Sequence, residues 1–178
     1  MKMDRSPVEI ERLDRVRVGG DEISFRVTTA QSGGALVAAE VRMPAGGGPP
    51  GLHRHPSAEV YRVDAGELCL YVEDAGGTVQ RTVAGPGEVV HIPGGRAHTI
   101  RNEAADEARA YVVFVPGAEM EGFARAAAPL AAAGPPRPED VIALAHDHGI
   151  EMTGQPVPAA GAAAGRADGG APGPASRR

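Results

Sequence analysis

The chain has 178 residues, which is enough for one domain with a hydrophobic core and too few for two domains of ordinary size. Its net charge of −5 gives no basic surface that would attract a phosphate backbone, so nucleic acid is not an expected partner. The charged N-terminal segment predicts neither a secretory signal nor a membrane anchor, and a single cysteine cannot form an internal disulfide. These features predict a cytoplasmic protein that does not bind membranes.

Residues 1–20 are expected to form an N-terminal arm, and residues 21–118 are expected to form the main domain. This second segment consists of short runs of β-forming residues separated by glycine and proline. Several runs alternate with period two, such as Ile23, Phe25 and Val27, as half-buried strands do. Strands are predicted at residues 22–29, 35–43, 59–63, 67–74, 78–83, 88–92, 97–102 and 109–115. Short strands with regular turns are typical of an all-β sandwich or barrel.

Residues 119–153 have a different composition and predict a helical extension. A helix is predicted at residues 120–133, where the larger apolar side chains recur near helical spacing. A second helix is predicted at residues 137–149, because Pro138 suits a first turn and Gly149 suits a helix end. The apolar faces of both helices need cover, so we expect them to pack against the barrel and to narrow its mouth.

Residues 154–178 form a low-complexity segment of alanine, glycine and proline. No apolar periodicity survives there, and such a composition cannot bury enough surface to offset its ordering entropy. We predict a disordered tail that does not join the barrel.

Two histidines, His53 and His55, stand one residue apart in the stretch GLHRHPSAEV. On a strand they would project from one face and could both point at one ion. The same alternation would place Glu59 on that face, although Pro56 lies between and favours a bend or an edge position, which weakens the prediction for Glu59. His98 follows a turn in a distant segment and would add a third imidazole. Imidazole and carboxylate donors suit one divalent transition ion such as Fe, Mn, Co, Ni or Zn.

These residues resemble the two sequence motifs of the cupin superfamily. Gly47, His53, His55, Glu59 and Gly66 match the first motif, G-x5-H-x-H-x3,4-E-x6-G. Gly87, Pro93, Gly95, His98 and Asn102 match the second motif, G-x5-P-x-G-x2-H-x3-N. The resemblance implies a double-stranded β-helix, the jelly-roll barrel of cupins, with four metal ligands: His53, His55, Glu59 and His98.

The chain is most similar to small single-domain bacterial cupins of the quercetin dioxygenase-like type. That resemblance implies a dioxygenase that uses dioxygen and an aromatic or enolisable small molecule, with Glu59 as both ligand and catalytic base. It also implies a homodimer, because many cupins pair. Cys69, Tyr71 and Val112 are expected on faces away from the cavity, where a second copy would cover them.

Two other classes of function fit the same residues. One is a metal-dependent cyclase, isomerase or lyase in which the ion acts only as a Lewis acid, and the other is a small-molecule-binding protein without catalysis. Strand parity predicts the pocket walls in either case. The predicted wall residues are Tyr61, Val63, Leu68, Leu70, Val72 and Ile100. Few of these wall residues are polar, which favours an aromatic or other hydrophobic ligand over oxalate or a sugar phosphate.

The remaining candidate residues have simpler interpretations. Cys69 lies in an apolar run and is expected to be a small buried side chain rather than a reactive thiol. His91 lies on the strand before Pro93, and the sequence does not determine which face of this strand points inward. A role for His91 in hydrogen bonding to a metal ligand therefore stays open. His146 and His148 fall at the end of the second helix, where capping is favoured over metal binding.

Overall fold

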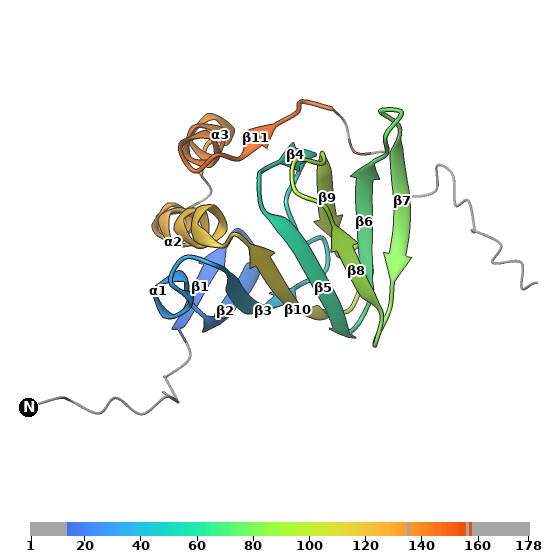
Figure 1. The fold of residues 1–178 in the computed structure, drawn as a ribbon, viewed down its shortest axis with the longest axis horizontal. Helices are drawn as coiled ribbons and strands as arrows, with labels where there is room; N and C mark the ends of the chain where they lie inside the picture. The colour runs from blue at the N-terminus through green and yellow to red at the C-terminus, as the bar shows by residue number, and fades with distance from the viewer. Residues whose placement is uncertain (1–13, 135, 156, 158–178) are drawn as a thin grey trace, which may run out of the picture.

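A computed structural model describes residues 14–134, 136–155 and 157, which form two facing antiparallel sheets with helices at one side (Figure 1). The first sheet has the order β1 (Asp14–Val18), β2 (Asp21–Val27), β3 (Val37–Met43), β10 (Ala108–Val115), β5 (Ala58–Ala65) and β8 (Val89–Ile92). The second has the order β11 (Glu151–Met152), β4 (His53–Arg54), β9 (His98–Arg101), β6 (Leu68–Glu73) and β7 (Val79–Ala84).

The predicted all-β barrel with C-terminal helices is confirmed, and each predicted strand segment contains a strand. The reason is visible in β5, where Glu59, Tyr61 and Val63 are buried while the side chains between them face outward. Strands that alternate in this way put one apolar face into the space between the sheets. The core is mainly aliphatic, as the scarcity of aromatic residues requires.

Two longer helices follow the barrel strands, α2 (Ala118–Ala132) and α3 (Pro138–Asp147), near the positions that the sequence predicts. Helix α2 lies against β1, and α3 lies beside α2 and β11 (Figure 1). Pro138 occupies the first turn of α3, and Gly149 leaves the helix with a φ of 72°, a left-handed conformation that favours glycine. The chain then returns to the second sheet as β11, which pairs with β4.

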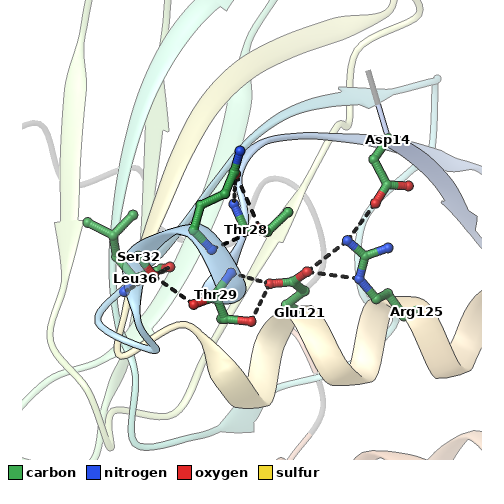
Figure 2. A network of polar contacts seen from close by, with 8 residues as sticks. Asp14, Thr28, Thr29, Ser32, Leu36, Glu121 and Arg125 are labelled. Atoms are coloured by element: carbon green, nitrogen blue, oxygen red, sulfur yellow. Dashed lines mark hydrogen bonds and ion pairs between the residues drawn. The ribbon is translucent and has the colours of Figure 1, made fainter. Parts of the chain in front are cut away.

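A polar network fastens α2 to the start of the barrel (Figure 2). The carboxylate of Glu121 accepts hydrogen bonds from the backbone N–H and the hydroxyl of Thr29, at 2.6 and 2.7 Å. Thr29 begins the short helix α1 (Thr29–Ser32). Arg125 lies 2.7 Å from Glu121 and 2.6 Å from Asp14, so the same network reaches β1. Helix α2 is therefore attached to two separate segments of the N-terminal half.

The domain boundaries differ from the expected ones at both ends. Residues 14–18 belong to the predicted arm but form β1, because Val16 and Val18 pack against the core. Val157 belongs to the predicted tail but packs against the cluster of Leu52, Cys69 and Tyr71 on the second sheet. The rest of the predicted arm, residues 1–13, and most of the predicted tail, residues 158–178, lie outside the described residues.

The residues on which the predicted dimer was argued are covered within a single chain. Cys69, Tyr71 and Val112 are all buried, with exposed fractions of 5%, 0% and 0%. Their burial removes that argument for a second copy, because nothing on those side chains is left to cover. In the part of the chain that the structure describes, no helix has the length and apolar character needed to span a membrane.

Candidate metal centre

Three histidines and one glutamate converge between the two sheets. His53 on β4 is the register partner of His98 on β9, so both imidazoles project from the same side of the second sheet. His55 follows in the connection to β5, and Glu59 reaches in from β5 of the first sheet. The ring centroids of His53 and His98 are 4.7 Å apart, and those of His55 and His98 are 5.0 Å apart.

The two motifs are joined by backbone hydrogen bonds that hold these side chains in place. The N–H of Gly95 donates to the carbonyl of His55 at 2.7 Å, from a turn in which Gly95 has a φ of 78°. Asn102 is buried and lies outside the cluster. Its side-chain amide donates to the carbonyls of Met43 at 2.9 Å and Asp106 at 2.7 Å. The asparagine of the second motif therefore braces a loop and supplies no ligand.

The imidazoles of His53 and His98 are oriented by the backbone. Nδ1 of His53 lies 3.1 Å from the carbonyl of Gly51, and Nδ1 of His98 lies 2.8 Å from the carbonyl of Arg96. A carbonyl accepts only an N–H, so Nδ1 carries a proton on both rings. Both rings are thus oriented so that Nε2 is the nitrogen available to a metal.

The cluster is buried, and part of its polar surface is unsatisfied. The exposed fractions are 7% for His53 and 2% for each of His55, Glu59 and His98. Nδ1 of His55 and Oε2 of Glu59 have no hydrogen-bond partner among the described residues, and Nε2 of His55 has only its contact with Oε1 of Glu59, at 2.8 Å. Burying such atoms without a partner costs free energy. Side chains that bind a metal ion present such unpaired donor atoms to it.

Mutual electrostatics set the charge of the cluster. Burial, reinforced by the neighbouring His98, lowers the pKa of His53 to about 4, so this imidazole is neutral at physiological pH. Burial alone would raise the pKa of Glu59, but hydrogen bonding and charge from His55 and His98 outweigh it and lower the pKa to about 2. The same contact with Glu59 outweighs burial at His98 and raises its pKa.

The distances fit a single divalent ion. The ligand nitrogens of the three histidines lie within 4.8 Å of one another. Oε1 of Glu59 lies 2.8 Å from Nε2 of His55 and 3.3 Å from Nε2 of His98. Imidazole nitrogens and one carboxylate are suitable donors for a first-row transition ion, and four protein ligands leave coordination positions for further ligands. The residues present therefore fit the metal that the resemblance implies.

Comparison with known proteins agrees with this fold. Residues 39–114 match the family model described as the cupin domain. These residues form a cupin domain. A mutant of oxalate decarboxylase from Bacillus subtilis has the same fold, with a TM-score of 0.52 and 22% identity over 59% of this chain and 28% of that chain. A predicted oxalate decarboxylase from Thermotoga maritima gives a TM-score of 0.50 and 20% identity over 58% of this chain and 93% of that chain.

Both likenesses concern the fold, and this chain spans about a quarter of the Bacillus protein's length. A search of curated proteins gives no match. The predicted cupin resemblance is confirmed at the level of the domain. The predicted ligand residues are brought together by the cupin domain, but their binding of an ion stays a prediction.

A cavity of about 760 Å³ opens from the candidate metal centre into the cupin domain. Its wall includes His53, Glu59 and His98, and most of the rest is apolar. The barrel contributes Ile23, Phe25, Ala39, Val41, Met43 and Ile100 among others, and α2 and α3 contribute Met120, Phe123, Ala124, Ala127, Val141 and Leu144. The helices therefore complete the cavity, as well as covering the barrel.

The predicted pocket residues fall into two groups. Tyr61 and Ile100 line the cavity. Val63, Leu68 and Leu70 are not on its wall; they are buried in the hydrophobic core. Val72 is partly buried and also packs against that core. Strand parity identifies the inward face of a strand, but it does not say how deep along the strand the cavity extends.

The cavity also contains a polar residue that sequence reasoning missed. Asp21 lies on its wall and accepts a hydrogen bond from the N–H of Gly48. Burial raises the pKa of this carboxyl from 3.8 to about 6, and the bond from Gly48 opposes that rise. The signal was present, because Asp21 continues the alternation of Ile23 and Phe25 toward the start of β2.

The other histidines stay away from the cluster. His91 is exposed on β8, so it does not hydrogen-bond to a metal ligand. His148 caps the C-terminus of α3 through its backbone, and its ring lies 6.4 Å from that of Phe123. His146 occupies the last turn of α3. In the described chain, the group of histidines that could hold an ion consists of His53, His55 and His98.

Proposed function

We propose that this protein is a metal-dependent dioxygenase of the quercetin dioxygenase-like type, acting on an aromatic or enolisable apolar small molecule. The observation that carries the proposal is a buried group of three histidines and one glutamate at the wall of an apolar cavity. A metal centre that faces a cavity can be reached by substrate, which is what separates catalytic sites from structural ones.

In this proposal His53, His55, His98 and Glu59 hold one divalent transition ion. When bound, the ion supplies Lewis acidity and, if it is redox-active, activation of dioxygen. The protein residues then have separate tasks. Glu59 is the carboxylate on the cavity wall, and it accepts a proton from an enol or phenol that the site has made more acidic. The surrounding apolar walls exclude water while the proton moves.

Tyr61 supplies a hydrogen-bond donor beside that base. Its ring lines the cavity and packs edge to face on Phe114, with ring centroids 6.3 Å apart. Burial and the negative charge of Glu59 raise the pKa of Tyr61 well above 10, so its hydroxyl stays protonated and can donate to an oxygen of the substrate. Substrate orientation and proton transfer would thus come from neighbouring positions on one strand, β5.

The wall chemistry also bears on which substrates fit. Among the described residues that line the cavity there is no arginine or lysine, whereas a small dianion would need a cation in addition to the metal. Apolar side chains from the barrel and from both helices would instead surround a ring. This composition favours an aromatic or enolisable molecule over oxalate, even though the solved structures with the same fold include oxalate decarboxylases.

The deciding experiment combines metal analysis with oxygen uptake. Purified protein is analysed for bound elements, then reconstituted with Fe, Ni, Co, Mn or Zn and screened in an oxygen electrode with flavonols and other enols. We expect one bound divalent ion per chain and oxygen uptake with at least one substrate. Turnover without oxygen uptake would replace the proposal by a Lewis-acid cyclase, isomerase or lyase. Ligand binding without any turnover would make the protein a small-molecule-binding cupin.

We also propose a homodimer that forms through the β8 edge of the first sheet. Val89 on this edge strand is 63% exposed, and Val60 on the neighbouring β5 is 39% exposed. An unpaired sheet edge next to exposed valines is a surface that association would cover. Light scattering at micromolar concentration should give the mass of two chains. A monomeric mass would contradict the proposal.

A further inference from the structure

The wall of the cavity contains one carboxylate whose charge has no counterpart. Glu59 contacts His55 and His98, and Glu121 contacts Thr29 and Arg125. Asp21 is the third carboxylate of the wall, and it makes no ion pair with any described residue. Its side chain thus differs from the other two in having no basic side chain beside it.

The geometry of β2 directs this carboxylate inward. Asp21, Ile23 and Phe25 alternate onto the cavity wall, whereas Glu22 between them faces Arg15 and Arg17 outside, at 3.5 and 3.4 Å. The side chain also packs on a glycine loop, where a Cβ added to Gly47 would collide with Oδ1 of Asp21. The carboxylate is therefore held at the wall and does not swing freely into solvent.

The hydrogen bonding of Asp21 is incomplete. The N–H of Gly48 lies 3.2 Å from Oδ1 and 3.1 Å from Oδ2, so both oxygens share one donor. A carboxylate can accept about four hydrogen bonds, which leaves most of its capacity unused toward described residues. Burial raises the pKa of Asp21 to about 6, the expected response of a partly buried carboxylate without enough donors.

We propose that Asp21 is a ligand-recognition residue, and that its carboxylate accepts a hydrogen bond from a hydroxyl or ammonium group at one end of an apolar ligand. The other end of this ligand lies at the metal centre, a placement that rests on the proposed function. In the first sheet β3 and β10 lie between β2, which carries Asp21, and β5, which carries Glu59, and both carboxylates line the same cavity. The preferred ligand therefore has a polar group at each end and an apolar body.

The test compares three matched probes on full-length, metal-loaded protein. Each probe is a biphenyl with a catechol on one ring, and its second ring bears a para hydroxyl, a para aminomethyl or a para methoxy group. Titration calorimetry gives the affinity of each probe for the wild-type protein and for Asp21→Asn, Asp21→Ala and Glu22→Gln. Glu22→Gln is the control, because Glu22 adjoins Asp21 but faces the outside. Circular dichroism checks that each variant is folded.

For the wild type we expect the hydroxyl or the aminomethyl probe to bind about tenfold or more tightly than the methoxy probe, as hydrogen bonds to charged groups allow. Asp21→Ala should remove this preference, and Glu22→Gln should keep it. Asp21→Asn separates the two ligand chemistries, because an amide oxygen still accepts from a hydroxyl but no longer attracts an ammonium by charge. Equal affinities for all three probes in the wild type, a preference that survives in folded Asp21→Ala, or no binding of any probe would overturn the proposal.

The outcome is separable from that of the proposed function. The affinity ratio between probes requires no turnover, so it can be measured even if oxygen uptake is absent. A preference that depends on Asp21 without oxygen uptake would keep Asp21 as the recognition residue and remove the dioxygenase. Oxygen uptake without any preference between the probes would keep the dioxygenase and remove Asp21 as the recognition residue.

Discussion

The metal-binding end of the cavity and its helical wall hold their residues in different ways. At the metal-binding end, His53, His98 and Glu59 come from three strands in both sheets, and hydrogen bonds donated to backbone carbonyls orient two of the imidazoles. Along the helical wall, α2 is fastened by the side-chain network around Glu121, and alanine and aliphatic side chains face the cavity. The first region holds the candidate ligand atoms in fixed positions, whereas the second determines the shape and volume of the cavity.

This difference predicts that substitutions at the metal-binding end change chemistry, and that substitutions on the helical side change stability or ligand choice. A buried polar cluster has few ways to compensate for a lost donor. An apolar wall can adjust its packing at modest cost.

The largest effect is expected for the histidines. His53→Ala, His55→Ala and His98→Ala should each lower bound metal at least about tenfold and abolish turnover with it, because each removes a ligand from a buried site. The measurement is metal per chain beside activity. His91→Ala is the matched control, since His91 is exposed on β8 and should change neither quantity. Full metal content in any of the three variants would contradict the assigned ligand set.

Glu59→Gln should separate metal binding from catalysis. Three neutral imidazoles can retain a divalent ion, so most of the metal should remain bound. The amide cannot accept the substrate proton, and loss of a general base typically costs about 10² to 10⁴ in rate. Metal content and turnover of the same preparation provide the measurement. Near-normal turnover with metal bound would show that Glu59 is not the base.

Glu121→Ala should destabilise the protein while leaving the metal in place. The change removes the acceptor of two hydrogen bonds from Thr29 and the partner of Arg125. Since Glu121 is buried, we expect the free energy of unfolding to fall by about 2 to 3 kcal/mol. Denaturant unfolding measures this, with Glu139→Ala as the control because Glu139 makes an exposed contact with Arg137. Equal losses for the two variants would mean that the network does not secure α2.

The smallest effect concerns pH. The pKa of Asp21 is raised to about 6 in the folded protein from 3.8, so the folded state holds this proton more tightly than the unfolded state does. The stability contributed by Asp21 is therefore fully present below about pH 4 and is lost as the pH rises through about 6. Asp21→Asn should remove that loss. Its melting temperature relative to the wild type should rise between about pH 4.5 and about pH 7.5, and a constant difference would contradict the raised pKa.

The strand pattern predicted the all-β fold, and the resemblance of the two motifs to those of cupins implied the convergence of His53, His55, Glu59 and His98. Alternation within a strand depends only on backbone geometry, which is why parity also placed Tyr61 and Ile100 on the inward faces that line the cavity. Strand parity did not predict correctly that Leu68 and Leu70 line the cavity, because these side chains face inward but lie in the packed core.

The order of amino acids by itself determined which side chains of a strand share one face, because that property follows from the local period. It also contained the two motifs whose resemblance to those of cupins implies that the three histidines meet. Only the tertiary structure decided that residues 14–18 join the first sheet, that α2 and α3 complete the cavity, and that Asp21 lies on its wall without a cation. These outcomes depend on contacts between segments far apart in the chain, such as Thr29 with Glu121 and Asp21 with Gly48. Such contacts form when two folded surfaces meet, and no local pattern in either segment specifies the other.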